Sequence, residues 1–590
     1  MPRRRSRRRS RSRGKCSVSD PSAPPLATPE HRGQGGWDSR QRGTGDRCGS
    51  GDCNGDGNGD GNGNGDGDGD GNGNGNGDGD GDGDGNGNGL QIGGSVQERD
   101  LGARLLLTLA LAPFALAAGI WLLDLEGGEG GAGLRGAAEV LLRTIVVSAG
   151  GAAAATIAGG ALGVAIAGHR IPLRGACAPL WLAPFLLPSV VVTTGAQSWL
   201  SDGPLVALVR GELGAVLLHG VQLAPLVLWG VARSLAAIPA AELHSARVLL
   251  APALATRLLA GRAAPVALRL GTLSFLLLLP RIEVSAYTGI ETIGTRALAA
   301  FTAAGSDLEG WLWCALCLAV AAPLLPFAAA PLAVGAAPAG LGRRDPIAPR
   351  SFVATSLALA AALLPLAGLV GLAIDALGEG IAPARGESAR WLAALATELP
   401  RLIPLAIALA LAGWRISLGV GRVGIALAAL PLVLPGCLPA LILVEGALPW
   451  IPRSLAAGTL PLDLAQAVRF LGVAVLLGRL ADRSLPTAER AAAALLPPAR
   501  RRFRVLLPRA AGAIAAAAAL LAALLIGEVE SAALVVPPGR LLPAVELHQL
   551  LHYRYDVQAA RLSLALGAVS GILVLLVGRV GRERRGEAEG

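Results

Sequence analysis

The chain has 590 residues, of which 52% are hydrophobic, 16% are charged and only 4% are aromatic, and its formal net charge is +9. This composition, with a mean hydropathy of +0.51, excludes an ordinary soluble globular protein and indicates helices that lie in lipid. The single lysine, Lys15, stands near the start of the chain, which excludes a P-loop site for nucleotide hydrolysis.

Residues 1–98 differ from the rest in composition. Arginine and serine alternate at the start, and Gly51–Gly89 consists almost entirely of Gly, Asp and Asn. Neither stretch buries enough apolar area to offset the chain entropy lost on folding, so a disordered cytoplasmic tail is predicted. Asp52-x-Asn54-x-Asp56 has the opening spacing of a calcium loop but lacks the later bidentate Glu, which favours a low-complexity linker. The basic start favours anionic lipid over nucleic acid as its contact.

About twelve apolar runs follow, each near the ~20 residues that a helix needs to cross ~30 Å of hydrocarbon. In the first half they lie near 103–123, 144–167, 177–199, 213–233, 266–285 and 311–334. In the second half they lie near 352–374, 400–414, 423–444, 463–480, 510–530 and 558–579. These runs predict an all-α polytopic membrane protein with two six-helix lobes, residues 99–340 and 341–590.

Arginines are concentrated in alternate loops between these runs. Arg343 and Arg344 mark one basic loop and Arg500–Arg502 another, whereas Asp124–Gly133 is acidic. Basic residues near helix ends resist translocation, so the basic loops and both termini are expected on the cytoplasmic side.

Two segments, Ile238–Pro265 and Leu485–Pro508, interrupt the apolar sequence in the same way, each before a long hydrophobic helix. The arginines of the later segment are costly in hydrocarbon, which puts this segment in the cytoplasm or at its surface. Pro497 and Pro498 lack backbone donors and fix φ, so a short helix must end or turn there. The later segment is therefore predicted to be a short helix, a bend and a second basic stretch that runs into a membrane span at Pro508.

Ionisable residues near the outer ends of two spans are a second candidate site. Glu283 follows Pro265 at nearly the distance at which Glu528 and Glu530 follow Pro508. Such carboxylates are costly in a membrane unless they face water, a partner or a cation. Two interpretations stay open: they line the path of a cationic or metal-bearing solute, or they pair with a neighbour such as Arg281. A further charge inside a span, Arg469, faces the bundle interior if the span is drawn correctly.

Cysteine and histidine patterns point to no metal site. Cys314-x-x-Cys317 has no second pair or nearby His, which favours two small apolar core residues one helical turn apart. In the last outer loop, His548 and His552 are spaced by one turn, near Tyr553 and Tyr555. A packing or surface role is favoured there over contact with a receptor or a metal.

The repeated segments resemble the cytoplasmic coupling loop of ABC importer permeases, whose pattern is Glu-Ala-Ala, three residues, Gly, nine residues, Ile-x-Leu-Pro. Five positions of the later segment match this pattern in register: Glu489, Ala491, Val505, Leu507 and Pro508. Arg490 replaces the first Ala, and Leu495 replaces the Gly that makes the family's bend.

The first segment matches the pattern more loosely. It keeps Ala246 and ends at Pro265, but His244 stands where the Glu belongs, and Glu242 is the expected substitute. The stretch LIGEVESAALVVPPGRLLPAVELHQLLHYRYD, after Pro508, resembles the corresponding region of fused ferric-iron permeases. Because the first segment departs from the pattern, weaker or altered coupling to the ATPase is expected in the first half.

The resemblance covers roughly residues 100–580 and implies a non-enzymatic subunit of the bacterial inner membrane. It implies three partners: a cytoplasmic ABC ATPase dimer that carries the ATP, a periplasmic or lipoprotein solute-binding protein, and the lipid bilayer. No cofactor on this chain and no nucleic acid is expected. Ferric iron is the favoured solute, with thiamine and polyamines as alternatives. Two other classes stay open, namely an ion-coupled secondary transporter of twelve helices and a membrane scaffold with degenerate coupling loops.

Overall fold

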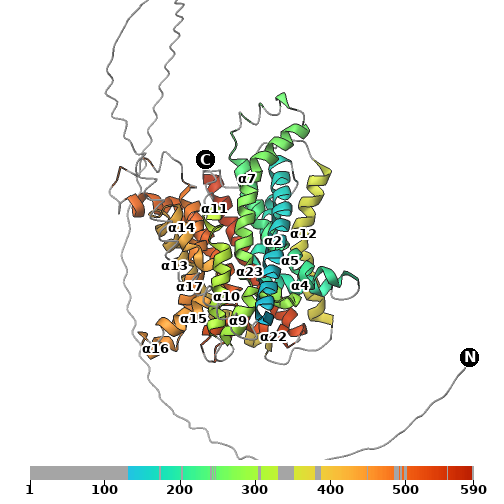
Figure 1. The fold of residues 1–590 in the computed structure, drawn as a ribbon. Coiled ribbons are helices and arrows are strands. Elements are labelled where there is room, and N and C mark those ends of the chain that lie inside the picture. Colours follow the sequence, from blue (N-terminus) through green and yellow to red (C-terminus); the bar gives the residue numbers. More distant parts are fainter. Residues whose placement is uncertain are drawn as a thin grey trace, which may run out of the picture. The chain divides into compact units, whose positions relative to one another are not determined.

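The computed structural model describes residues 131–169, 171, 174–200, 204–239, 242, 245, 248–250, 252–302, 307–329, 351–378, 387–447, 450–483, 485, 491, 495–496, 501–537, 539–553 and 556–587. This part of the chain is all-helical (Figure 1). The predicted tail and the predicted span at 103–123 lie outside the described residues.

The first half contains α2 (Gly131–Gly168), α3 (Arg174–Leu186), α4 (Ser189–Leu200), the 3-10 turn η1 (Pro204–Leu208), α5 (Gly211–Ala236), α7 (Pro252–Leu278), α8 (Glu283–Thr288), α9 (Ile293–Thr302), α10 (Asp307–Ala321) and α11 (Leu325–Ala329). The second half contains α12 (Phe352–Gly378), α13 (Glu387–Ser417), α14 (Arg422–Ala428), η2 (Leu430–Leu432), α15 (Cys437–Ile442), η3 (Leu443–Ala447), α16 (Arg453–Ala456), α17 (Leu460–Arg483), η5 (Arg501–Leu506), α20 (Leu507–Ile526), α21 (Ala532–Val535), α22 (Pro543–His552) and α23 (Asp556–Glu587).

Seven of the described helices are long and apolar enough to cross a membrane, or eight if the bent pair α3–α4 is counted as one span. The seven lie in α2, α5, α7, α12, α13, α17 and α20, where apolar runs were predicted. The run at 400–414 belongs to a longer helix, because α13 continues through Pro400 and Pro404. The described residues therefore form a multi-pass helical membrane protein, and the predicted total of twelve spans is not reached among them.

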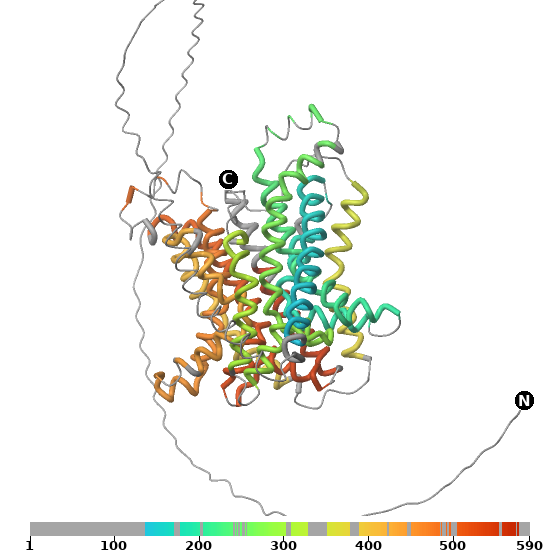
Figure 2. Tube along the Cα trace, viewed as in Figure 1, coloured from blue at the N-terminus to red at the C-terminus, as the bar shows by residue number. Residues whose placement is uncertain are grey.

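Two predicted spans are broken. The run at 177–199 is bent by 103° between α3 and α4, where Pro188 cannot donate a helical hydrogen bond. The run at 423–444 is divided into α14, η2, α15 and η3, and Pro435, which cannot donate a helical hydrogen bond, lies in the break before α15. Figure 2 shows α4 leaving the direction of the neighbouring helices.

Three other predicted spans also differ from the helices observed. The run at 311–334 is shortened to α10 by a turn at residues 322–324, with α11 beyond it. The last run lies in α23, whose apolar part is Val557–Leu573. The helix α7 begins at Pro252, so the first of the two predicted cytoplasmic segments is already helical well before Pro265. Its Ala- and Leu-rich sequence favours helix there.

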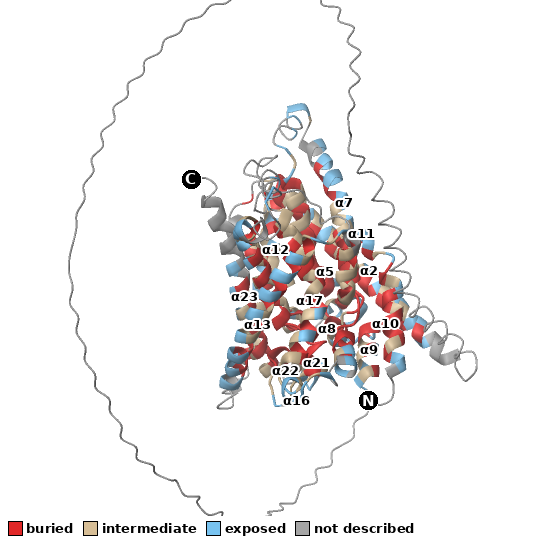
Figure 3. Cartoon of the chain, turned by 90° about the vertical axis from the view of Figure 1, so that its left-hand side faces the viewer, coloured by how far each residue is buried: buried red, intermediate tan, exposed pale blue. Residues whose placement is uncertain are grey.

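The long helices pack in two groups. In the first half α2, α5 and α7 contact one another, and in the second half α13, α17 and α20 do the same. Two contacts cross between the halves: α12 and α23 pack on α3 and α4, whereas the α14–α15 region joins the hydrophobic core of α5, α7 and α10. Buried residues fill the spaces between these helices, as Figure 3 shows. The breaks at Pro188 and Pro435 therefore lie where the two halves meet.

Candidate functional site

The first predicted coupling segment is only partly described. His244 and Ala246 lie outside the described residues, so their prediction is not tested. Glu242 is exposed, and its carboxylate accepts a hydrogen bond of 2.6 Å from the Arg262 guanidinium. This ion pair joins the start of the segment to the part of it that lies in α7. Pro265 lies inside α7 and is exposed, rather than at the start of the helix.

The second segment has a different arrangement. Glu489 lies outside the described residues, whereas Ala491 and Leu495 are exposed. Val505 and Leu507 are half-buried against the core of the second half, and Pro508 occupies the first turn of α20. A proline is well tolerated there because the first helical N–H groups have no partner in the helix. The later proline thus starts a helix, whereas its counterpart Pro265 is inside one.

The buried charges of the second half gather around Arg469 on α17. The Nε of Arg469 lies 3.2 Å from a carboxylate oxygen of Glu528, and an Nη atom donates to Glu530. All three residues are buried. The Arg469 side chain therefore faces the bundle interior, as the sequence predicted for a span drawn near 463–480.

Glu530 also binds the backbone of both halves. Its Oε1 accepts a hydrogen bond of 2.9 Å from the Ile282 N–H, in the turn between α7 and α8. Its Oε2 accepts one of 3.0 Å from the Gly436 N–H, at the break before α15. A Cβ at Gly436 would lie 2.2 Å from the Arg469 Nη1 and 2.6 Å from Glu530, so any larger residue there would displace one of these side chains. Charge-assisted hydrogen bonds of this kind are stronger than neutral ones.

A polar network of the first half occupies the corresponding place. Arg281 donates to the Gln222 side-chain oxygen at 2.7 Å and to the Ser189 hydroxyl at 3.1 Å. The Gln222 amide also donates to Ser189, at 2.7 Å. Glu283, two residues beyond Arg281, is buried as well. The two sequence interpretations of Glu283, a solute path or a pair with Arg281, stay predictions.

The two networks occupy equivalent positions in the sequence. The same number of residues separates Ser189 from Gly436, Gln222 from Arg469, and Glu283 from Glu530. The prolines before the first pair are matched as well, so both helix breaks are in register. Sequence reasoning matched only the carboxylates. It missed the equivalence of Gln222 on α5 and Arg469 on α17, because one side chain is neutral and the other is charged.

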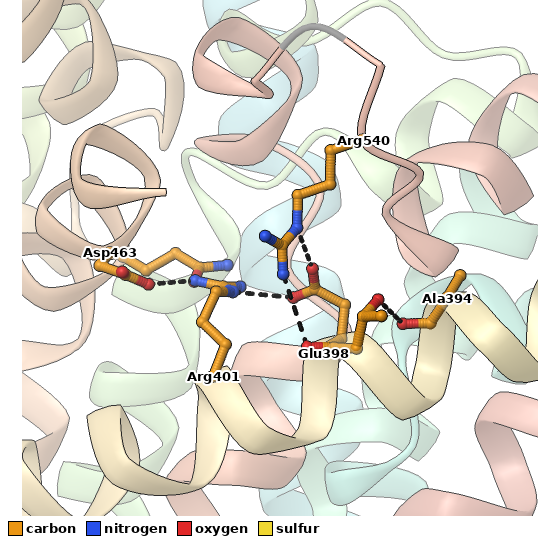
Figure 4. A network of polar contacts seen from close by, with 7 residues as sticks. Ala394, Glu398, Arg401, Asp463 and Arg540 are labelled. Atoms are coloured by element: carbon orange, nitrogen blue, oxygen red, sulfur yellow. Dashed lines mark hydrogen bonds and ion pairs between the residues drawn. The ribbon is translucent and has the colours of Figure 1, made fainter. Parts of the chain in front are cut away.

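A second ionic network joins α13 to the first turn of α17 (Figure 4). Arg401 on α13 donates to Glu398 at 2.8 Å and also binds Asp463 in the first turn of α17. Arg540, which precedes α22, donates to the other Glu398 oxygen at 2.8 Å. The first half has a simpler counterpart, in which Arg143 on α2 lies 3.0 Å from Glu212 in the first turn of α5.

One neutral pair also crosses between the halves. The Tyr287 hydroxyl on α8 lies 2.7 Å from the Nδ1 of His548 on α22, and the two rings meet edge to face. Burial, and to a smaller extent His552, lowers the pKa of His548 below its ordinary value. His552 packs on the exposed Tyr553, and Tyr555 lies outside the described residues. The favoured packing role thus agrees with the contacts of His548.

We expect this histidine to make the folded state sensitive to acid. Because its folded pKa is lowered, the unfolded chain binds a proton that the folded chain does not, so stability is lost as the pH falls below about 6.5. The His548→Gln variant, which does not titrate, should lose less stability between about pH 7.5 and 5.5. Thermal unfolding in detergent across this pH range measures the difference, and parallel curves for the two proteins would refute it.

Buried thiols lie close to the Glu530 centre. Cys314 and Cys317 on α10 and Cys437 on α15 share one hydrophobic core, and the Cys317 thiol donates to the Val433 carbonyl at 3.0 Å. The prediction that the C-x-x-C pair is buried core is confirmed. Among the described residues, no group of His, Cys, Asp and Glu has the arrangement of a metal site.

Comparisons with protein-family models, curated proteins and solved structures gave no match to the chain.

Proposed function

We propose that the chain is the membrane-spanning permease subunit of an ATP-binding cassette importer in a bacterial inner membrane. In this proposal it has two six-helix lobes, residues 99–340 and 341–590, and both termini are cytoplasmic. It takes a small solute from a solute-binding protein and passes it to the cytoplasm. Separate ATPase subunits supply the energy.

The observation that carries this proposal is an arginine-bearing segment at the same place in both halves. One segment begins after α5 and runs into α7, and the other begins after α17 and ends at the start of α20. The buried residues on either side of these segments are matched in register, from the breaks before α4 and α15 to Glu283 and Glu530. Two docking segments, one in each half, would match the two ATPase subunits of such an importer.

Movement would follow from ATPase closure. A docked ATPase dimer has two arrangements, and nucleotide biases the equilibrium between them. The short helix predicted around Glu489 and Ala491 would transmit this bias to α20 through Val505, which packs on the core of the second half. In the first half, the Glu242–Arg262 ion pair would hold the corresponding segment against α7.

Ferric iron remains the solute that the sequence resemblance favours, with thiamine or a polyamine as alternatives. The predicted path residues Glu528 and Glu530 are engaged by Arg469. A naked cation would therefore have to compete with an internal guanidinium for their oxygen atoms. This favours passage of the metal with its own ligands over coordination by these two carboxylates.

Co-purification with a co-expressed candidate ABC ATPase tests the proposal. We expect the detergent-solubilised wild-type chain to retain the ATPase and the Glu489→Ala variant to lose it. Glu291→Ala is the matched control, because Glu291 is an exposed acid that is paired with Arg296 and lies outside both predicted coupling segments. Loss of the ATPase from both variants, or from neither, would contradict docking at Glu489.

The buried charges at two broken helices favour a second candidate, an ion-coupled secondary transporter, because such transporters bind their ions at helix breaks. Uptake in proteoliposomes that contain the purified chain alone distinguishes the two functions. Transport driven by an ion gradient without an ATPase would replace the importer proposal by this one.

A further inference from the structure

Three contacts between the halves converge near the ends of α7 and α20. The Ile282 N–H donates to Glu530, Tyr287 lies against His548, and Gly527 packs on Pro188. We propose that the Glu530 carboxylate is a latch, which closes the solute path at this end of the molecule and is released during each transport cycle. The release step rests on the proposed transport function, but the latch contacts themselves do not.

The donors to this carboxylate suit a contact that breaks and re-forms. Ile282 and Gly436 donate from turns, not from the interior of a helix. Both amides can move away from Glu530 without unwinding a helix. Since Glu530 and Gly436 belong to the second half and Ile282 to the first, separation of the halves at this end must break the hydrogen bond from Ile282.

Arg469 also has a partner for the released state. Glu528 lies 3.2 Å from its guanidinium, on the same turn as Glu530. If Glu530 moves away, Arg469 keeps one buried counter-charge and is not left unpaired. An isolated buried charge is strongly destabilising, whereas a charge that can exchange partners permits two states of similar free energy.

The absence of a side chain at Gly436 leaves room for Arg469 and Glu530 to contact each other. A Cβ at Gly436 would overlap both Arg469 and Glu530, so Gly436→Ala must displace the carboxylate or the guanidinium. Gly446 provides a matched control in the neighbouring π-helical turn, because a Cβ there would meet nothing within 4 Å. The two substitutions add the same methyl group, with and without a clash at the latch.

A native cysteine reports on release. Cys437 follows Gly436 directly and has no solvent exposure in this structure. Cys177 is also buried, but it lies in a different core between α3, α5 and α12. Opening of the latch should therefore expose Cys437 and leave Cys177 protected, whereas general unfolding exposes both.

The test is the rate at which a small, charged methanethiosulfonate reagent labels each cysteine of the full chain in micelles, read by peptide mass spectrometry. We expect Glu530→Gln and Gly436→Ala to raise the labelling rate of Cys437 about tenfold, with Cys177 and the Gly446→Ala protein unchanged. Unchanged labelling in both latch variants would overturn the proposal. Equal increases at Cys437 and Cys177 would also overturn it, because the contact would then be a general structural one. No ATPase is present, so the result is independent of ATPase capture.

Discussion

Replacing Arg469 by methionine should destabilise the chain by about 3–5 kcal/mol, the range found when one partner of a buried ion pair is removed. The substitution keeps an unbranched side chain but leaves Glu528 and Glu530 buried without their guanidinium. Equilibrium unfolding in mixed detergent micelles of increasing SDS content measures the free energy of unfolding.

The same substitution should be much less harmful once the two acids are neutral. In the Arg469→Met, Glu528→Gln, Glu530→Gln protein, the amide oxygen at position 528 still accepts from the Ser531 N–H, and the one at position 530 keeps one of its two backbone donors. We expect most of the lost stability to return, because neutralising a whole buried ionic group is often close to neutral in free energy. A loss below about 1 kcal/mol in the single variant, or no recovery in the triple variant, would mean that Arg469 is not the counter-charge of these acids.

The buried ion pairs of Arg469 with Glu528 and Glu530 show which features of the site the sequence predicts and which it does not. Placing Glu283 and Glu530 at equivalent depths required only the spacing to the prolines of the two repeated segments. The partner of Glu530 was not predictable in the same way, since Arg469 stands far along the chain on another helix. A signal for it exists in the sequence, because Gln222 and Arg469 are separated by the same interval as the two glutamates.

Helix continuity was predicted less well than helix position. Apolar composition located α2, α5, α12 and α17, since about twenty apolar residues suffice to cross a bilayer. It did not separate a continuous span from a broken one. α13 runs through Pro400 and Pro404, whereas the region from α14 to η3 is interrupted at Pro435, before α15. The difference lies in packing, because the interrupted region turns between the halves and its Gly436 amide binds Glu530.

The close approach of α2 and α5 depends on glycines that composition alone does not distinguish. Gly159 and Gly163 lie one turn apart on the face of α2 that contacts α5. A Cβ at Gly159 would lie 2.3 Å from the Ala224 carbonyl oxygen and 3.0 Å from the Leu228 nitrogen. In lipid, small residues let helix backbones pack this tightly. Van der Waals contacts then stabilise the helix pair, because apolar lipid provides no hydrophobic driving force for association.

Gly159→Ala is therefore expected to destabilise the chain by about 2–3 kcal/mol, because its methyl group meets backbone atoms that cannot rotate away. The adjacent Gly160→Ala is the control: its methyl group would lie 3.8 Å from the Ala267 Cβ, an ordinary contact. Alanine also favours helix over glycine by up to about 1 kcal/mol, so Gly160→Ala should be neutral or stabilising. SDS unfolding of the two variants measures the difference. Equal effects would mean that α2 and α5 are not in backbone contact at Gly159, since helix propensity alone cannot separate two neighbouring glycines.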